Sequence, residues 1–281
     1  MSIKIVTDST CDLPQDVIKK LGITVIPLYI NIGDEGYLDG VDISRKEFYT
    51  NLPDYESHPT TATPSIDTFK TVFKTLADKG ASEILTIHIS ESLSATVKVA
   101  ESAAAEFDLI PVTVRDSQQL SMGTGFQVEL AAKMAKEGKS MADITAALDD
   151  LTKRTFVTAG LDTLEFLRRS GRMNVFLAGI GSLLQLKPLL TMKNGLPGSE
   201  QVRTAKKAFA RLVEMLNWYL PIEKFALLHT NAAEKAEMLK EQIKDLLPKE
   251  KIFSMDITPV IGAHIGPGAV GFALVSKEEI E

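Results

Sequence analysis

Ile84-Leu85-Thr86-Ile87-His88-Ile89-Ser90-Glu91-Ser92-Leu93-Ser94-Ala95-Thr96 is the stretch that best indicates the fold. Its first six residues are rich in apolar side chains and predict a buried strand. Ser90-Glu91-Ser92 then predicts a turn, and the chain beyond it predicts a helix that runs to about Phe107. A buried strand that leads through a turn into a helix is the unit from which α/β proteins are built.

The same order of strand, polar turn and helix occurs at two other places. Ile3–Val6 leads to Asp8-Ser9, after which Pro14 can open a helix, and Pro111–Val114 leads to Asp116-Ser117. Alternating strands and helices predict a mostly parallel sheet with helices on both faces. Right-handed crossovers then bring all the loops that follow these strands to one edge, where ligands bind in open α/β sheets.

Two segments between the first and the central strand predict less regular structure. Ile23–Ile30 predicts a strand in which Pro27 indicates an edge position or a bulge. The chain from Gly33 to Pro64 is polar and predicts a long irregular connection of the sort that carries function or covers a site.

The second half of the chain predicts a different arrangement of elements. The predicted strands are Thr155–Ala159, Leu186–Met192 and Phe225–Leu228, and the predicted helices are Asp162–Arg169, Val175–Leu184, Gln201–Trp218 and Glu234–Leu247. We therefore expect an N-terminal α/β domain with a parallel sheet over residues 1–153 and a C-terminal α/β domain with a mixed sheet over residues 154–281.

Composition narrows the class of protein. The chain has 281 residues, of which 44% are hydrophobic and 24% charged, and a formal net charge of −6, which argues against general nucleic-acid affinity. No apolar run reaches the ~18–20 residues of a membrane span, and the N-terminus leads into a strand without a signal-peptide pattern. We expect a cytoplasmic protein. Cys11 is the single cysteine and the four histidines are scattered, so no metal site is predicted.

Gly262-Ala263-His264-Ile265-Gly266-Pro267-Gly268-Ala269 is the strongest candidate for a functional loop. A single histidine among residues with small side chains lets the backbone approach another group closely and leaves one polar side chain to address it. The alternative interpretation is a buried structural histidine in a turn, which is the interpretation that we favour for His88 in its apolar strand.

Two hydroxyl-rich turns are possible partners for His264. In Thr60-Thr61-Ala62-Thr63-Pro64-Ser65, Thr63 predicts a helix cap and Pro64 the first helical position, and Leu93-Ser94-Ala95-Thr96 precedes the next helix. Both turns can be ordinary helix caps. Together with His264 they can instead gather hydrogen-bond donors around one small anionic group, such as a carboxylate or a phosphate.

These residues resemble the DegV family of fatty-acid-binding proteins, the binding subunits of bacterial fatty acid kinase. Thr61-Ala62-Thr63-Pro64-Ser65 is similar to the family's Thr-Ser-Gln-Pro-Ser motif, Leu93-Ser94-Ala95-Thr96 to its Leu-Ser-Gly-Thr motif, and the His264 segment to its Gly-x-His-x-Gly-Pro-Gly-Ala pattern. The other similar stretches are Ile5–Pro14, Leu161–Arg172 and Val202–Ala208.

The resemblance implies a two-domain α/β protein that holds one long-chain fatty acid between its domains. It implies that Thr61, Ser94 and His264 hold the carboxylate, with no cofactor and no catalytic residue. We expect further residues to lie in loops that support this pocket, namely Ser9, Thr63, Ala95, Gly262 and Gly266.

This sequence departs from the family pattern at three places. Ala62-Thr63 replaces Ser-Gln, Ala95 replaces a glycine next to the expected head-group site, and Ser170 replaces a glycine. If Ala95 starts a helix, its φ is negative and its methyl group is tolerated.

Binding of a fatty acid divides into two physical tasks. Burying about sixteen carbons at ~0.8 kcal/mol per CH₂ yields on the order of 10 kcal/mol before ordering costs. The carboxylate needs hydrogen bonds, because a desolvated and unpaired charge is costly. The hydroxyls, helix-start N–H groups and imidazole can offset that cost.

Basic residues stand out in this acidic chain. Arg168, Arg169, Arg172 and Arg203 are candidates for docking an ATP-binding kinase subunit or a phosphate, or else they form a solvated helical face. By resemblance, the partner kinase converts the presented carboxylate into an acyl phosphate for phospholipid synthesis, and transient contact with a membrane surface is compatible with this role.

Two enzymatic alternatives remain open at this point. Ser94, His264 and Asp8 or Asp116 supply the residue types of an esterase, although Gly-x-Ser-x-Gly is absent around Ser94. A phosphotransfer protein needs a phosphate-binding loop, and Met122-Gly123-Thr124-Gly125 is a weak substitute for one.

Overall fold

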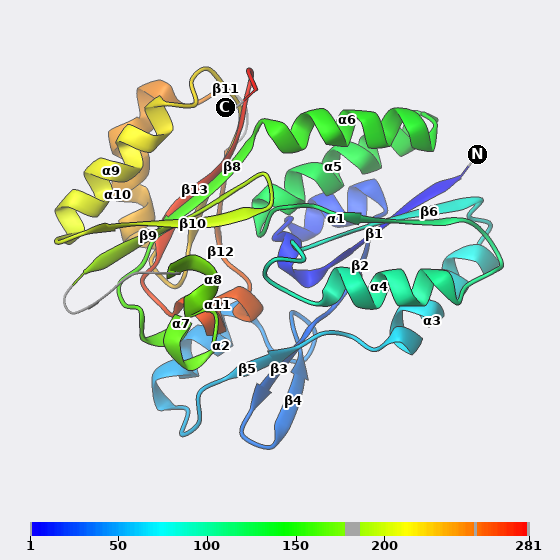
Figure 1. The fold of residues 1–281 in the computed structure, drawn as a ribbon, viewed down its shortest axis with the longest axis horizontal. Coiled ribbons are helices and arrows are strands. Elements are labelled where there is room, and N and C mark those ends of the chain that lie inside the picture. Colours follow the sequence, from blue (N-terminus) through cyan, green and yellow to red (C-terminus); the bar gives the residue numbers. More distant parts are fainter. Residues whose placement is uncertain (1, 178–185, 250–251, 280–281) are drawn as a thin grey trace.

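The computed structural model describes residues 2–177, 186–249 and 252–279. Figure 1 shows the arrangement of its strands and helices. The strands are β1 (Ile3–Asp8), β2 (Thr24–Ile26), β3 (Tyr29–Ile32), β4 (Glu35–Leu38), β5 (Thr60–Ala62), β6 (Glu83–His88), β7 (Val112–Asp116), β8 (Thr155–Gly160), β9 (Lys187–Lys193), β10 (Leu196–Val202), β11 (Ile222–His229), β12 (Phe253–Asp256) and β13 (Val270–Ser276).

Helices connect most of these strands. They are α1 (Gln15–Leu21), α2 (Arg45–Asn51), α3 (Ile66–Asp78), α4 (Thr96–Ala105), α5 (Met122–Lys136), α6 (Met141–Lys153), α7 (Glu165–Arg169), α8 (Met173–Leu177), α9 (Ala205–Asn217), α10 (Ala233–Ile243) and α11 (Pro259–Ile265). Short 3₁₀ turns occur at Ser9–Cys11, Leu52–Asp54 and Lys244–Leu246.

The first sheet has the order β2-β1-β6-β7, and its pairings are parallel, as predicted. Alternation along each strand sends side chains to opposite faces. Ile5 and Leu85 pack toward α5, whereas Val6 and Ile84 pack against the apolar face of α3 and α4. The sheet therefore lies between two helical layers (Figure 1), and its loops after β1, β6 and β7 share one edge.

The second sheet has the order β10-β9-β8-β13-β11-β12 and is mixed, as predicted, because only β11 and β12 pair in parallel. Phe156 and Phe272 face α9 and α10 on one side, whereas Val157 and Ala273 face the side of α5. The core cluster that contains Val157 also contains Ile5, so one hydrophobic core joins the two sheets. The boundary between residues 153 and 154 stays a prediction.

The prediction for the region before α3 is wrong in two respects. The run Ile23–Ile30 is not one strand, because β2 ends before Pro27 and β3 belongs to a separate three-stranded sheet of order β4-β3-β5. The segment Gly33–Pro64 is not irregular, because it contains β4, α2 and β5. The small sheet and α2 share a core cluster with Val260 and Ala263 of α11, which come from the far end of the chain.

Some element boundaries also differ from those predicted. Ser65, not Thr63, caps α3 by accepting a hydrogen bond from the N–H of Thr68. The predicted helix Gln201–Trp218 begins at Ala205, because Gln201 and Val202 pair with β9 as part of β10. Beyond Leu177, the predicted helix Val175–Leu184 lies outside the described residues.

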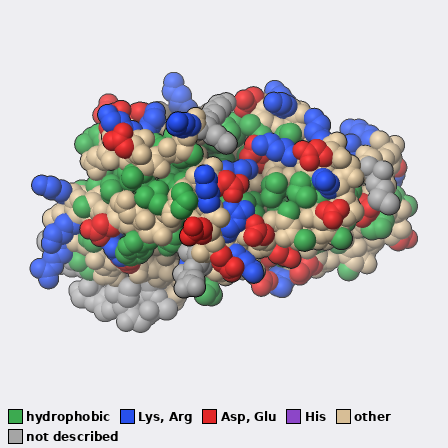
Figure 2. Space-filling view, turned by 90° about the horizontal axis from the view of Figure 1, so that it is seen from above, with side chains coloured by type: hydrophobic (Ala, Val, Ile, Leu, Met, Phe, Trp, Pro, Cys, Tyr) green, Lys and Arg blue, Asp and Glu red, His purple; other side chains and the backbone are tan. Residues whose placement is uncertain are grey.

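The surface in Figure 2 carries acidic and basic side chains interspersed with hydrophobic ones. This pattern fits a chain of net charge −6 with no large field of one sign on that face. Within the described residues, no helix is long and apolar enough to cross a membrane.

Candidate functional site

A cavity of about 170 Å³ lies where the two sheets and the small sheet meet. Most of its wall is apolar. Its lining includes Leu28 of the β2–β3 connection, Leu120, Val157 and Ala159 of β8, Leu190 and Met192 of β9, and Val260 and Ile261 of α11. Thr61, Thr63, Ser94, Ala95, Arg172 and His264 add polar groups or backbone to the same wall. The structure thus brings the three predicted carboxylate-binding residues to one cavity.

Thr61 and His264 are in direct contact although 203 residues separate them. Thr61 lies in β5, where it pairs with Ile30 of β3, and its Oγ1 is 3.0 Å from Nε2 of His264. His264 lies in the last turn of α11, and its Nδ1 is buried without a hydrogen-bond partner among the described residues. This arrangement offers a hydroxyl and an imidazole to one small polar group.

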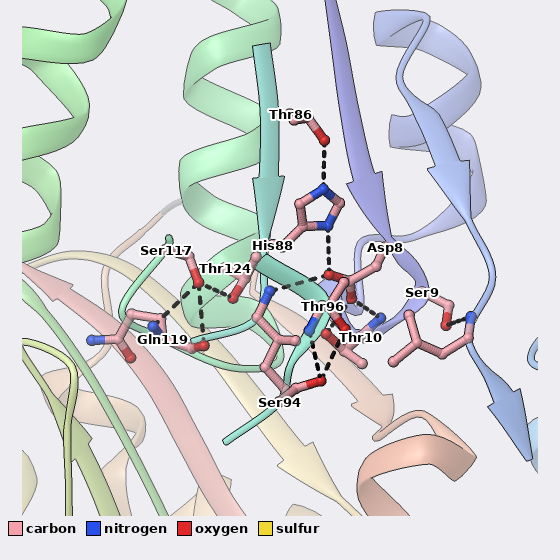
Figure 3. Close-up of polar contacts among 12 residues, drawn as sticks. Asp8, Ser9, Thr10, Thr86, His88, Ser94, Thr96, Ser117, Gln119 and Thr124 are labelled. Carbon is pink, nitrogen blue, oxygen red and sulfur yellow. Dashed lines mark hydrogen bonds and ion pairs between the residues drawn. The ribbon is translucent and has the colours of Figure 1, made fainter. Parts of the chain in front are cut away.

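Ser94 and Ala95 approach the cavity from the loop between β6 and α4. Ser94 Oγ is 2.9 Å from Thr96 Oγ1 and accepts a hydrogen bond from the N–H of Thr96 (Figure 3). Ala95 has a φ of −74°, so its methyl group causes no backbone strain, as predicted. The departure from glycine at this position is therefore compatible with the local backbone.

Burial, together with the positive charge of Arg172 and the imidazole of His58, lowers the pKa of His264 from 6.5 to about 4. His264 is therefore neutral at pH 7 in this structure. A neutral imidazole has one N–H donor and one acceptor nitrogen, so it can adapt to a hydroxyl or to a carboxylate by choice of tautomer.

The four candidate docking arginines do not form one group. Arg172 is partly buried on the cavity wall, and its Nη1 donates to the carbonyl of Ser170. Arg168 and Arg169 are exposed and each forms an ion pair of 2.7 Å with Glu165. Arg203 is exposed before α9. Arg172 thus differs from the other three by lining the same cavity as Thr61, Ser94 and His264, and the docking role of all four stays a prediction.

Gly262 and Gly266 allow the close backbone approach that the sequence indicated, but within a helix and against aromatic rings. The segment around His264 is the helix α11 rather than a loop. A Cβ on Gly262 would overlap the ring of Tyr49, and one on Gly266 would overlap the ring of Phe166. These glycines therefore let α11 pack closely between two aromatic side chains, and neither lines the cavity.

Ser9 lies away from the first cavity. It lines a second cavity of about 620 Å³, together with Asp12, Asp39 and Arg45. Its Oγ accepts a hydrogen bond from the N–H of Leu28. The structure thus links Ser9 to the first cavity through Leu28, which is one of the lining residues.

A buried polar network lies behind the β6–α4 loop (Figure 3). His88 is fully buried, with Nδ1 2.9 Å from Asp8 Oδ2 and Nε2 2.5 Å from Thr86 Oγ1, so it is the satisfied core histidine that we predicted. The other oxygen of Asp8 accepts hydrogen bonds from Thr10. Among the described residues, Asp8 pairs with His88 and His264 contacts Thr61, so Ser94, His264 and Asp8 do not form the hydrogen-bond chain of a Ser–His–Asp hydrolase.

The remaining chemical motifs have structural roles. Gly123 and Gly125 are buried in α5, where a Cβ would meet Val157 and the carbonyl of Cys11. They allow close packing and do not form a phosphate-binding loop. Within the described residues, no group of three or more His, Cys, Asp or Glu side chains is placed to hold a metal ion.

The apolar wall of the cavity was missed at the sequence level. β8 and β9 are largely buried on both faces, so their apolar residues do not alternate with polar ones. That lack of alternation was the available signal, but it does not distinguish a side chain that faces a ligand from one that lies in the core. Val260 and Ile261 in α11 are also apolar and line the cavity, and their sequence likewise does not distinguish these two roles.

Comparisons with known proteins agree with this arrangement. Residues 2–277 match the DegV family. A fatty acid-binding DegV family protein from Thermus thermophilus has 36% identity and a TM-score of 0.89, with 98% of this chain and 100% of that chain covered. DegV of Bacillus subtilis, a fatty acid-binding protein, has 31% identity and a TM-score of 0.90, with 99% and 100% covered.

A stearic acid-binding protein from Eubacterium ventriosum has 25% identity and a TM-score of 0.88, with 98% of each chain covered. The family match and these structures cover nearly the whole chain, and the TM-scores of 0.88, 0.89 and 0.90 show that the structures share its α/β fold. The chain belongs to the DegV family.

Proposed function

We propose that this protein binds one long-chain fatty acid in the first cavity, with Thr61, Ser94 and His264 at the carboxylate and the apolar wall around the acyl chain. The observation that carries the proposal is the contact between Thr61 and His264 on a cavity that is otherwise mostly apolar. A fatty acid has the same division into one small anionic group and a long apolar chain.

The ligands of the related structures support the same class of molecule. The Thermus and Bacillus proteins bind fatty acids, and the Eubacterium protein binds stearic acid. An apolar cavity of about 150 Å³ holds a molecule the size of benzene. A cavity of about 170 Å³ therefore requires side chains of its wall to move as a long acyl chain enters. Met192 can do so, because it lines the cavity and its unbranched side chain has three rotatable bonds.

We further propose that the bound carboxylate is presented to a separate ATP-dependent kinase subunit, which forms the acyl phosphate used in phospholipid synthesis. Arg172 on the cavity wall supports this step, because a guanidinium suits an oxyanion next to the head group. Arg168 and Arg169 are exposed beside Glu165, and Arg203 is exposed before α9, so a kinase subunit or a membrane surface can reach all three side chains. The chain itself then acts in the cytoplasm as a carrier without catalysis.

Native mass spectrometry with lipid extraction tests the proposal. We expect one long-chain fatty acid per chain after purification from bacteria. S94A and H264A should each weaken fatty-acid binding by about 10- to 100-fold, because a hydrogen bond to a charged group contributes about 1.5–3 kcal/mol. S102A is the matched control, since Ser102 is an exposed serine on α4 that does not line the cavity, and its Oγ donates to the carbonyl of Lys98.

A protein that gains no mass with added fatty acids would contradict the binding proposal. The kinase step is tested in the same samples by adding the kinase subunit and ATP and trapping acyl phosphate with hydroxylamine as the hydroxamate. Hydroxamate that forms without the kinase subunit would contradict the carrier role.

A further inference from the structure

Three parts of the molecule that are distant in sequence meet at the start of α11. The backbone N–H of Thr258 donates to Oδ1 of Asp12 over 3.0 Å, and Thr258 Oγ1 donates to Oδ2 of Asp39. Asp12 follows β1, Asp39 follows β4, and Thr258 joins β12 to α11. Thr258 is fully buried, and Asp12 and Asp39, which line the second cavity, are only 2% and 5% exposed.

Helix α2 binds the same segment from its other side. Arg45 forms an ion pair of 2.9 Å with Asp12, and its Nη1 donates to the carbonyl of Asp256. The hydroxyl of Tyr49 donates to the carbonyl of Ile257 over 3.0 Å. The residues that lead into α11 therefore have their polar groups bonded to α2 as well as to the two carboxylates.

Thr258 does not use its hydroxyl in the ordinary way for its position. It is the N-cap residue of α11, where a threonine side chain normally accepts a hydrogen bond from the first turn. Here no such bond forms, and the hydroxyl is committed to Asp39. The hydroxyl of Thr258 therefore connects the start of α11 to Asp39, which follows β4, instead of capping the helix.

The cluster also costs energy to bury. Two carboxylates and one guanidinium leave a local excess of negative charge when all are ionised, and burial raises the pKa of both Asp12 and Asp39. Buried charge clusters contribute little net stability and in some proteins serve to define a conformation. This cluster is therefore better explained by holding the start of α11 in place than by adding to the stability of the fold.

What the cluster positions is the head-group residue His264. His264 lies six positions after Thr258, which corresponds to about 9 Å of helix. Tyr49 and Phe166 pack against the glycines of α11 on its sides, so the bonds of Thr258 restrain the helix along its axis. Asp12 also accepts a hydrogen bond of 2.5 Å from Ser121, which lines the first cavity.

We propose that Thr258, Asp39 and Asp12 are positioning residues that hold α11 in the one placement where His264 faces Thr61 and the ligand carboxylate. The statement about the ligand carboxylate rests on the proposed function. The statement that these residues place His264 opposite Thr61 is independent of it.

T258V tests the proposal, because valine has the shape of threonine and lacks the hydroxyl that bonds to Asp39. The main readout is the titration of the His264 imidazole by NMR, whose pKa of about 4 depends on burial and on its position relative to Arg172 and His58. In T258V we expect this pKa to rise toward 6.5, and in T258S, which restores the hydroxyl, to return. We also expect fatty-acid binding to weaken about tenfold in T258V only.

T155V is the matched control. Thr155 is a buried threonine whose hydroxyl donates to the carbonyl of Leu151, at the start of β8 and outside the cavity lining, so its loss should leave the His264 titration unchanged. If T258V does not fold, T258A is the milder variant, because it leaves room for water beside Asp39, and the same rise is expected.

The outcomes separate the two proposals. An unchanged His264 titration in T258V or T258A overturns the positioning role, whether or not the protein binds fatty acids. A wild-type protein that binds no fatty acid overturns the proposed function, while a His264 titration that moves in T258V and returns in T258S still supports the positioning role. An equal shift in T155V also overturns it, since the effect would then be a general loss of stability.

Discussion

His264 is the residue at which burial, charge and hydrogen bonding act together. Burial and the neighbouring Arg172 lower its pKa from 6.5 to about 4, so the folded protein holds it neutral at pH values where the unfolded chain would protonate it. The unfolded state thus binds more protons between pH about 6.5 and about 4, and stability falls as the pH is lowered through this range. Asp12 acts in the opposite direction, because burial raises its pKa from 3.8 to about 6.

Replacing His264 isolates its contribution. As the pH falls from 7 to 4.5, we expect the wild type to lose more free energy of unfolding than H264N loses. The reason is that the imidazole of His264 takes up a proton in the unfolded wild type but not in the folded wild type, and H264N has no such group. Urea unfolding of both proteins at several pH values measures the difference, and the contribution of Asp12 cancels in it. A difference that stays constant over this range contradicts a neutral, buried His264.

Helix α11 is the element on which the site depends most. It is only seven residues long, yet it carries His264, lines the cavity with Val260 and Ile261, and contacts the small sheet. Its glycines are explained by packing. Gly266 has a φ of +75°, and its Cα faces the ring of Phe166 so closely that no Cβ fits.

G266A should therefore destabilise the fold twice over. We expect a loss of about 2–4 kcal/mol in the free energy of unfolding, from a strained backbone and from overpacking against Phe166. G171A is the matched control, because Gly171 has a φ of +73° but open space around its Cα, so about 1 kcal/mol is expected there. Urea unfolding measures both. If G266A and G171A cost the same, the contact with Phe166 is not what requires glycine.

At the scale of the whole molecule, the cavity lies at the junction of all three sheets. Its wall combines Thr61 from the small sheet, Ser94 from the loop after β6 of the parallel sheet, and Leu190 from the mixed sheet. A ligand held there contacts all three and binds the folded state alone, so it should stabilise the whole fold.

Thermal unfolding tests this coupling. A fatty acid at about 100 times its dissociation constant should add about 2.7 kcal/mol to the stability and raise the Tm by roughly 5 °C. S94A at the same ligand concentration should show a smaller shift, and so should wild type with a fatty alcohol of equal length, which lacks the carboxylate. Equal shifts with acid and alcohol would mean that the polar end of the cavity does not recognise a carboxylate.

Sequence alone determined much of this architecture. The apolar runs of β1, β6 and β7, each followed by a polar turn and a helix, predicted a parallel sheet because strand and helix have different periodicities. The motifs around Thr61, Ser94 and His264 indicated the family, since each motif is local and its residue types are distinctive, and the fold then places these three residues on one cavity.

Tertiary structure decided what depends on contacts between distant residues. No local signal distinguishes Ser65 from Thr63 as the cap of α3, or shows that the glycines near His264 face Tyr49 and Phe166 within a helix. The apolar wall of the cavity and the bonds of Thr258 to Asp12 and Asp39 have no sequence pattern either. Periodicity records which side of an element is buried, whereas the partner that buries it is set only when the chain packs.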